Sequence, residues 1–114
     1  MEAFDSARLG GGAPPILTDK GYLEIYHGAS RAYRYCLGAM LLDRDNPARI
    51  LARSETPLME PLAPCERRGF FGNVVFTDGA LVRNDELWIY YGASDTVTCV
   101  AKTSFKTIWK HLGM

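Results

Sequence analysis

The sequence predicts an all-β protein with one short helix at its C-terminal end, and three observations carry this prediction. Apolar residues alternate or cluster in short runs that turn signals separate, which is typical of strands. The run from Ser104 to about Leu112 instead places apolar residues at helical spacing behind a capping serine. A pattern of ten residues also occurs twice, which indicates that the strands belong to a repeated unit.

Each element follows from local signals along the chain. Residues 1–15 are rich in glycine, alanine and proline, so we expect a loop there. The run DRDNP at 43–47 lacks the glycine and the closing glutamate of a calcium loop and predicts a turn. Prolines in the segment 57–68 predict a long surface loop. Strands are expected near residues 16–18, 22–28, 33–42, 49–53, 73–77, 80–83, 86–92 and 97–102.

The repeat consists of GYLEIYHGAS at 21–30 and DELWIYYGAS at 85–94, which are identical at six of ten positions. Each copy follows a run that ends in Thr-Asp and precedes a second strand that contains a cysteine. Repeated units of several strands are typical of propeller blades, which stack in about four to eight copies. We expect one partial propeller domain over 1–114, with repeat units at about 10–60 and 70–103 and the helix at about 104–112.

Two blades alone would leave apolar faces and strand edges uncovered, so the repeat implies either missing blades or assembly with other chains. The chain has 114 residues and is 47% hydrophobic, which suits one domain. Its 13 basic and 13 acidic residues balance, so no long-range field favours nucleic acid or an anionic membrane.

The cysteines indicate a reducing, cytoplasmic setting. Cys36, Cys65 and Cys99 are odd in number and form no CxxC pair, which argues against a disulfide framework and against a zinc site. The first twenty residues lack the basic start and the apolar stretch of a signal peptide. We therefore expect a cytoplasmic protein without a metal.

Among the four positions at which the two copies of the repeat differ, one polar residue at the end of the strand is a candidate for a site. His27 ends the apolar strand in IYHGAS and precedes Gly28, whereas the second copy has Tyr91. An imidazole at that place can donate to an anion or to a sugar hydroxyl. The alternative is a histidine that only completes hydrogen bonds at the end of a strand.

Two more charged residues have a functional and a structural interpretation. Asp95 follows the second copy and could bind sugar hydroxyls as a bidentate acceptor, or it could close an Asx turn. Arg8 precedes a glycine run and could help to hold phosphate, or it could be a solvated side chain. The chain has two histidines, and no Ser-His-Asp or Cys-His arrangement can be placed from them.

From about Phe4 to Thr103 the chain resembles the C-terminal part of glycoside hydrolase family 130, and three segments carry the resemblance. They are DSARLGGGAPPILTDKGYLEIYHGAS, YCLGAMLLDRDNPARILARSETPLMEP and ERRGFFGNVVFTDGALVRNDELWIYYGASDT. The resemblance implies about two blades of a five-bladed β-propeller. It also implies an enzyme that splits β-mannosides, mostly by phosphorolysis with inversion and in some branches by hydrolysis.

The resemblance assigns roles residue by residue. The residues expected to hold phosphate are Arg8, His27 and Tyr35, and those expected to bind the sugar substrate are Asp95 and Tyr26. Inorganic phosphate would be the co-substrate, with no other cofactor. The general-acid aspartate and two phosphate-binding arginines of the family match no segment here, so we expect no catalytic residue and no activity from this chain alone.

The leading hypothesis is therefore a part of a glycoside phosphorylase that releases mannose 1-phosphate from β-mannosides. The alternative is a non-catalytic carbohydrate- or phosphate-binding module that completes a propeller by self-association, and a third is a decayed reading frame. Expected partners are an oligosaccharide, phosphate, and either further copies of the chain or a missing N-terminal part, but neither nucleic acid nor a membrane.

Overall fold

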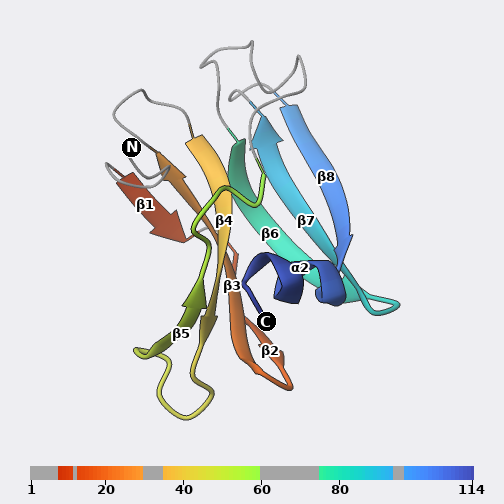
Figure 1. Ribbon diagram of the computed structural model, residues 1–114. Helices are drawn as coiled ribbons and strands as arrows, with labels where there is room; N and C mark the ends of the chain where they lie inside the picture. Colours follow the sequence, from red (N-terminus) through yellow and green to blue (C-terminus); the bar gives the residue numbers. More distant parts are fainter. Residues whose placement is uncertain (1–7, 12, 30–34, 60–74, 94–96) are drawn as a thin grey trace.

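The structure is a computed structural model that describes residues 8–11, 13–29, 35–59, 75–93 and 97–114, without the side chains of residues 8, 9, 75–78, 93 and 97. These residues form two antiparallel sheets and one short helix that packs against them (Figure 1). The predicted all-β architecture with a C-terminal helix is confirmed.

The first sheet has the strand order β1-β3-β4-β5, with β2 also paired to β3, and the second has the order β6-β7-β8. The elements are β1 (Arg8–Gly11), β2 (Ile16–Thr18), β3 (Gly21–Ala29), β4 (Tyr35–Leu42), β5 (Ile50–Arg53), β6 (Val75–Arg83), β7 (Glu86–Ala93), β8 (Val97–Ser104) and α2 (Phe105–His111).

Most of the predicted strands are confirmed, and two predictions were wrong. The N-terminal loop prediction misses β1, because this glycine-rich strand forms by pairing with β3 rather than from a local apolar pattern. The strands predicted at 73–77 and 80–83 are one strand, β6, in which the register with β7 shifts between Thr77 and Gly79. A bulge of this kind interrupts the alternation of side chains without ending the strand.

The predicted turn at 43–47 is confirmed between β4 and β5. The backbone N–H of Asp45 donates to Oδ1 of Asp43 at 2.9 Å, and the N–H of Asp43 donates to the carbonyl of Arg49 at 2.9 Å. The predicted loop at 57–68 lies mostly outside the described residues. Its first part is tied to the first sheet, because Met59 forms an isolated bridge with Leu37.

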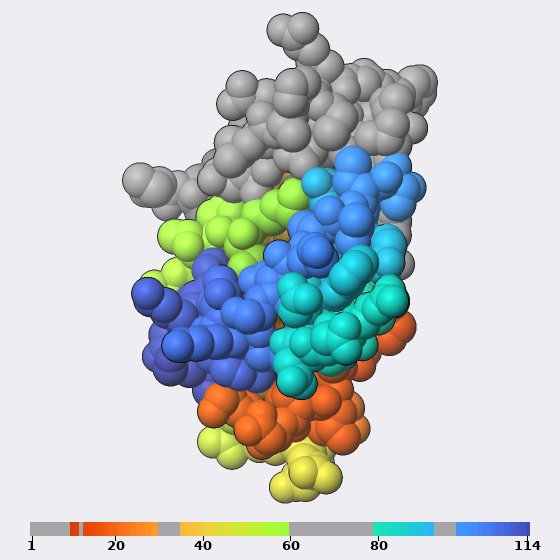
Figure 2. Space-filling model, turned by 90° about the vertical axis from the view of Figure 1, so that its right-hand side faces the viewer, coloured from red at the N-terminus to blue at the C-terminus, as the bar shows by residue number. Residues whose placement is uncertain are grey.

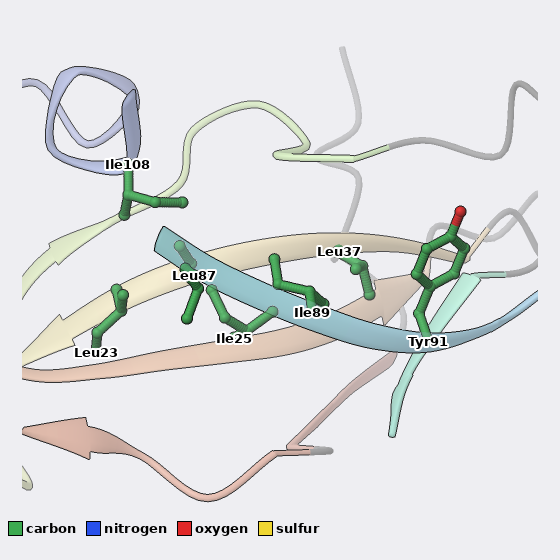
Figure 3. Close-up of a cluster of buried hydrophobic side chains, with 8 residues drawn as sticks. Leu23, Ile25, Leu37, Leu87, Ile89, Tyr91 and Ile108 are labelled. Atoms are coloured by element: carbon green, nitrogen blue, oxygen red, sulfur yellow. The ribbon is translucent and has the colours of Figure 1, made fainter. Parts of the chain in front are cut away.

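One hydrophobic core joins the two sheets and the helix. Figure 3 shows its side chains gathered between the strands β3, β4 and β7, with the helix contributing from above. Burial of a large aliphatic side chain contributes about 1.5–3 kcal/mol, so this cluster supplies much of the stability. Its buried members are Leu23, Ile25, Leu37, Ala39, Leu87, Ile89, Tyr91 and Ile108.

The two copies of the repeat contribute equivalent positions to this core. Leu23 and Ile25 in β3 correspond to Leu87 and Ile89 in β7, and all four belong to the same cluster. Because side chains alternate along a strand, the intervening residues of β3 and β7 lie on the outer faces of the two sheets. Each sheet therefore has an inner face in the core and an outer face that points away from it.

The register defines these outer faces, since residues directly opposite each other share a face. The outer face of the first sheet includes Leu17, Tyr22, Glu24, Tyr26, Met40, Leu42, Ile50 and Arg53. The outer face of the second sheet includes Leu81, Arg83, Glu86, Trp88, Tyr90, Val100 and Lys102.

Helix α2 is short and is held by a cap and by its contacts with both sheets. The side chain of Ser104 accepts from the backbone N–H of Thr107 at 3.1 Å, as the sequence predicts. Residues of β2, β6 and α2 surround a hollow of about 280 Å³. Figure 2 shows the three segments, in orange, teal and dark blue, next to one another.

A polar contact also fixes the end of the helix to the first sheet. Ser54 is buried, and its Oγ accepts from the backbone N–H of Ala39 at 2.8 Å and lies 2.7 Å from Nε2 of His111. Which of these two atoms, Oγ or Nε2, donates depends on the tautomer of His111. The pair therefore ties the end of α2 to the segment that follows β5.

Candidate functional site

The three predicted phosphate positions lie at one end of the first sheet, where β1, β3 and β4 are side by side. Arg8 and Tyr35 both pair with Ala29, and Gly10 pairs with His27. Positions directly opposite or two residues apart share a face, so the sheet brings positions 8, 27 and 35 to the same side in two neighbouring rows. The rows are about 7 Å apart. For Arg8 only the backbone is described.

The ring of His27 lies directly over Gly10. A Cβ atom at position 10 would come within 2.7 Å of Nε2 of His27, closer than such atoms approach in proteins. A glycine at this place is therefore required by the position of the imidazole and not by backbone conformation. The sequence showed the glycine run and the histidine as separate signals, and the pairing of β1 with β3 joins them.

Burial sets the protonation of His27. The side chain is partly buried, and loss of water lowers the pKa of its imidazole below the usual value of 6.5. At neutral pH the ring is therefore neutral, with one N–H donor and one acceptor nitrogen. An anion bound beside the ring would raise this pKa again, because its negative charge stabilises the protonated imidazole.

Tyr26 lies on the opposite face of β3 from His27. Its side chain is only 1% exposed, and the guanidinium of Arg53 lies 5.7 Å from the centre of its ring. The first sheet thus separates two neighbouring residues that the sequence analysis placed in one site. Asp95 belongs to the segment 94–96, outside the described residues.

The residue that corresponds to His27 in the second sheet has a different environment. Tyr91 is 6% exposed and belongs to the core cluster. Its strand β7 has β6 on one side and β8 on the other. At this position the first sheet therefore has a partly buried imidazole over a glycine, whereas the second sheet has an aromatic ring packed in the core.

Two polar side chains on the outer face of the first sheet had no signal in the sequence analysis. Arg53 stacks on Tyr26, and the carboxylate of Glu24 reaches Gly11, where an added Cβ would lie 3.3 Å from Oε1. Burial raises the pKa of Glu24 above 4.5. The alternation of β3 places Glu24 and Tyr26 on one side, but the approach of Arg53 depends on the pairing of β4 with β5.

Neither a metal site nor a membrane span occurs within the described ranges. Over those ranges, no three histidine, cysteine, aspartate or glutamate side chains come together to hold a metal ion. None of the helices found there is long and apolar enough to cross a bilayer.

Comparison with known proteins gives one consistent match. A family model described as beta-1,4-mannooligosaccharide phosphorylase, for glycoside hydrolase family 130, matches residues 1–113. Beta-1,2-mannobiose phosphorylase from Listeria innocua is 50% identical over 93 residues, which are 82% of this chain and 26% of that protein. 1,2-beta-oligomannan phosphorylase from Thermoanaerobacter is 44% identical over 105 residues, 92% of this chain and 36% of that protein.

The solved structures agree with the sequence comparison. The structure of the Listeria innocua beta-1,2-mannobiose phosphorylase with beta-1,2-mannobiose superposes with a TM-score of 0.94 and 44% identity, over 97% of this chain and 31% of that one. The neighbours are propeller proteins, so the predicted fold class, part of a β-propeller, is confirmed. The chain spans about a quarter to a third of the length of these relatives.

Proposed function

The chain belongs to glycoside hydrolase family 130, and from that premise we propose that it forms the C-terminal part of a β-mannoside phosphorylase. In this proposal it contributes groups that bind phosphate and sugar, and the rest of the propeller contributes the general acid. The observation that carries the proposal is the alignment of positions 8, 27 and 35 on one side of the first sheet, with His27 over Gly10.

Phosphate binding is assigned to Arg8, His27 and Tyr35. A guanidinium matches the oxygens of phosphate in shape and charge, and a neutral imidazole and a phenol each donate one hydrogen bond. Several donors around one anion fix the direction from which its oxygen attacks the anomeric carbon. Because the imidazole is neutral before phosphate arrives, His27 recognises the anion by its N–H rather than by a permanent charge.

Sugar binding is assigned to Asp95, and Tyr26 has a supporting role. A carboxylate can accept hydrogen bonds from two neighbouring hydroxyls of a mannosyl ring. Tyr26 supports the site from the outer face of the sheet, where its ring is packed beneath Arg53. The packing of Tyr26 holds strand β3 in place, and His27 lies on the opposite face of that strand.

The reaction proposed for the whole protein is an inverting phosphorolysis. A phosphate oxygen attacks the anomeric carbon from one face of the sugar, the glycosidic bond breaks, and an acid on the other face protonates the leaving oxygen. The products are mannose 1-phosphate and the shortened sugar. No acid for this step is assigned to this chain, so it is inactive alone. The relatives are named as phosphorylases, which favours this proposal over a non-catalytic binding module.

The direct test is a chimera with the Listeria innocua enzyme. The matching part of that enzyme is replaced by this chain, and release of mannose 1-phosphate from β-1,2-mannobiose is measured with and without phosphate. We expect phosphate-dependent release by the chimera and none by this chain alone, because the acid comes from the other blades.

The control is the same chimera with His27→Ala. Removal of a group that stabilises the transition state costs on the order of 100-fold in rate, and we expect a loss of that size with the fold intact by circular dichroism. A folded chimera that releases mannose 1-phosphate equally well with alanine at position 27 would refute the assignment.

A further inference from the structure

Four residues form one row across the first sheet at the level of His27. Gly10 in β1 and Leu37 in β4 lie directly opposite His27, one on each side of it, and Leu37 forms the isolated bridge with Met59. Residues directly opposite each other share a face, so these side chains are neighbours on the inner face of the sheet. The imidazole therefore has a glycine on one side and a leucine on the other.

Leu37 fills the space on the β4 side of the imidazole. Its side chain is 0% exposed, and Figure 3 shows it between the strands with the rest of the core cluster. The ring of His27 lies on the other side, where Nε2 is 2.7 Å from the place of a Cβ added to Gly10. Because protein interiors are close-packed, a ring that cannot enter the volume of Leu37 is confined to the side of β1.

The segment that follows β5 holds Leu37 in this place. The backbone N–H of Leu37 donates to the carbonyl of Met59 at 2.9 Å, and the carbonyl of Leu37 accepts from the N–H of Leu58 at 2.8 Å. The side chains of Leu58 and Met59 are partly buried and pack against the core cluster. Backbone bonds and packing together therefore keep Leu37 from yielding to the imidazole.

The equivalent row of the second sheet is built differently. Tyr91 has Thr77 opposite it in β6 and Cys99 opposite it in β8. The glycine beside His27 thus corresponds to a larger residue, and the leucine beside His27 corresponds to a smaller one. Both neighbours differ together with the residue that they flank, which favours a common role for the row of the first sheet.

We propose that Leu37 is a positioning residue for phosphate binding, which together with Met59 confines the imidazole of His27 over Gly10. This role rests on the proposed function, in which His27 donates to phosphate. A donor that is already in place loses less conformational freedom when the anion arrives. With a freer ring, bound phosphate would have to draw the imidazole back to its place, and that cost would raise KM and leave kcat nearly unchanged.

The test uses the chimera with Leu37→Ala, which opens the space on the β4 side. In the unsubstituted chimera we expect a nuclear Overhauser effect between the imidazole of His27 and Hα of Gly10, because one Hα points where the added Cβ would meet the ring. In Leu37→Ala this contact should be lost. KM for phosphate should rise about tenfold, the value of roughly one hydrogen bond, and kcat should stay within about twofold.

Two further variants separate volume from identity. Leu37→Met keeps the volume of the side chain and should restore both the contact and KM. Met59→Ala removes the support of Leu37 at the edge of the row and should weaken the contact less than Leu37→Ala does. Since Met59 is only partly buried, this variant decides the question if Leu37→Ala does not fold.

Leu41→Ala is the matched control. Leu41 is also a leucine of β4 that is 0% exposed, but it lies opposite Leu23 and not opposite His27. It should lower stability as Leu37→Ala does and leave the contact of His27 and KM for phosphate in place. Circular dichroism checks that every variant is folded, and the His27→Ala chimera identifies the signals of His27.

The two readouts distinguish the positioning role from the proposed phosphate site. An unchanged contact between His27 and Gly10 in folded Leu37→Ala, or an equal loss in Leu41→Ala, would overturn the role of Leu37. If Leu37→Ala does not fold, an unchanged contact in Met59→Ala would overturn it. Loss of the contact with unchanged KM for phosphate would support the positioning of the ring and contradict phosphate binding by His27.

Discussion

The two sheets are built from one repeated pattern, and they differ most at the end where β3 and β7 finish. In the first sheet, His27 is partly buried over Gly10, and burial lowers the pKa of its imidazole. In the second sheet, the equivalent Tyr91 packs into the core. The leucine and isoleucine positions that the copies share build the scaffold, and one of the four positions at which they differ, His27 against Tyr91, carries the candidate chemistry.

The shared positions should contribute equally to stability in both sheets, and truncating them is the change with the largest expected effect. Ile25→Ala and Ile89→Ala should each lower the free energy of unfolding by about 2–4 kcal/mol, because each leaves a cavity in one common core. Urea denaturation measures this, with Ile50→Ala, which removes a half-exposed side chain, as control. An Ile89→Ala protein as stable as wild type would show that the second sheet does not share the core.

Exchanging the residues at positions 27 and 91 should separate the scaffold from the candidate site. In the chimera, His27→Tyr copies the second sheet into the first and should lower kcat/KM for phosphate on the order of 100-fold, because the imidazole donor is lost. Tyr91→His is the matched change in the second sheet. It should alter stability but leave kcat/KM for phosphate within about threefold. Equal losses from both changes would contradict the assignment of the site to the first sheet.

Substitution of the glycine beneath His27 should have a smaller effect on phosphate binding. Gly10→Ala would put a Cβ within 2.7 Å of Nε2 of His27, so the ring must move. We expect KM for phosphate in the chimera to rise about tenfold, since a displaced donor loses roughly one hydrogen bond. Gly79→Ala is the control, because a Cβ there meets nothing within 4 Å. Unchanged KM in the Gly10→Ala chimera would argue against a role for the ring position.

The smallest expected effect is on stability as a function of pH. The pKa of His27 is lower in the folded chain than its ordinary value of 6.5, so below that pH the unfolded chain takes up a proton that the folded chain resists. The stabilising contribution is present above about pH 6.5 and is lost as pH falls through the folded pKa. Urea denaturation from about pH 8 to pH 5 should show a shallower decline for His27→Gln than for wild type. Parallel curves would mean that burial does not perturb the imidazole.

Local sequence signals predicted most of the fold. The alternation in GYLEIYHGAS, the capping Ser104 and the turn at Asp43 each gave an element that the structure confirms. The local signals failed where pairing between strands distant in the sequence determines the structure. Strand β1 forms only because β3 offers it an edge, and the bulge near Gly79 hides the continuity of β6.

The candidate site was predictable as residues but not as an arrangement. The difference between His27 and Tyr91 is visible in the sequence, and so is the glycine run. The contact of Gly10 with the imidazole depends on the register of β1 against β3, which no local pattern specifies. The packing of Arg53 on Tyr26 likewise depends on a strand that lies more than twenty residues away.

The most direct measurement of the central claim is an NMR titration of this chain with inorganic phosphate, following the imidazole signals of its two histidines. His111, which is hydrogen-bonded to Ser54 at the end of α2, is the internal reference. The account predicts that the His27 signals shift and saturate with phosphate while those of His111 stay in place. Signals of His27 that do not move, or that move only as much as those of His111, would contradict it.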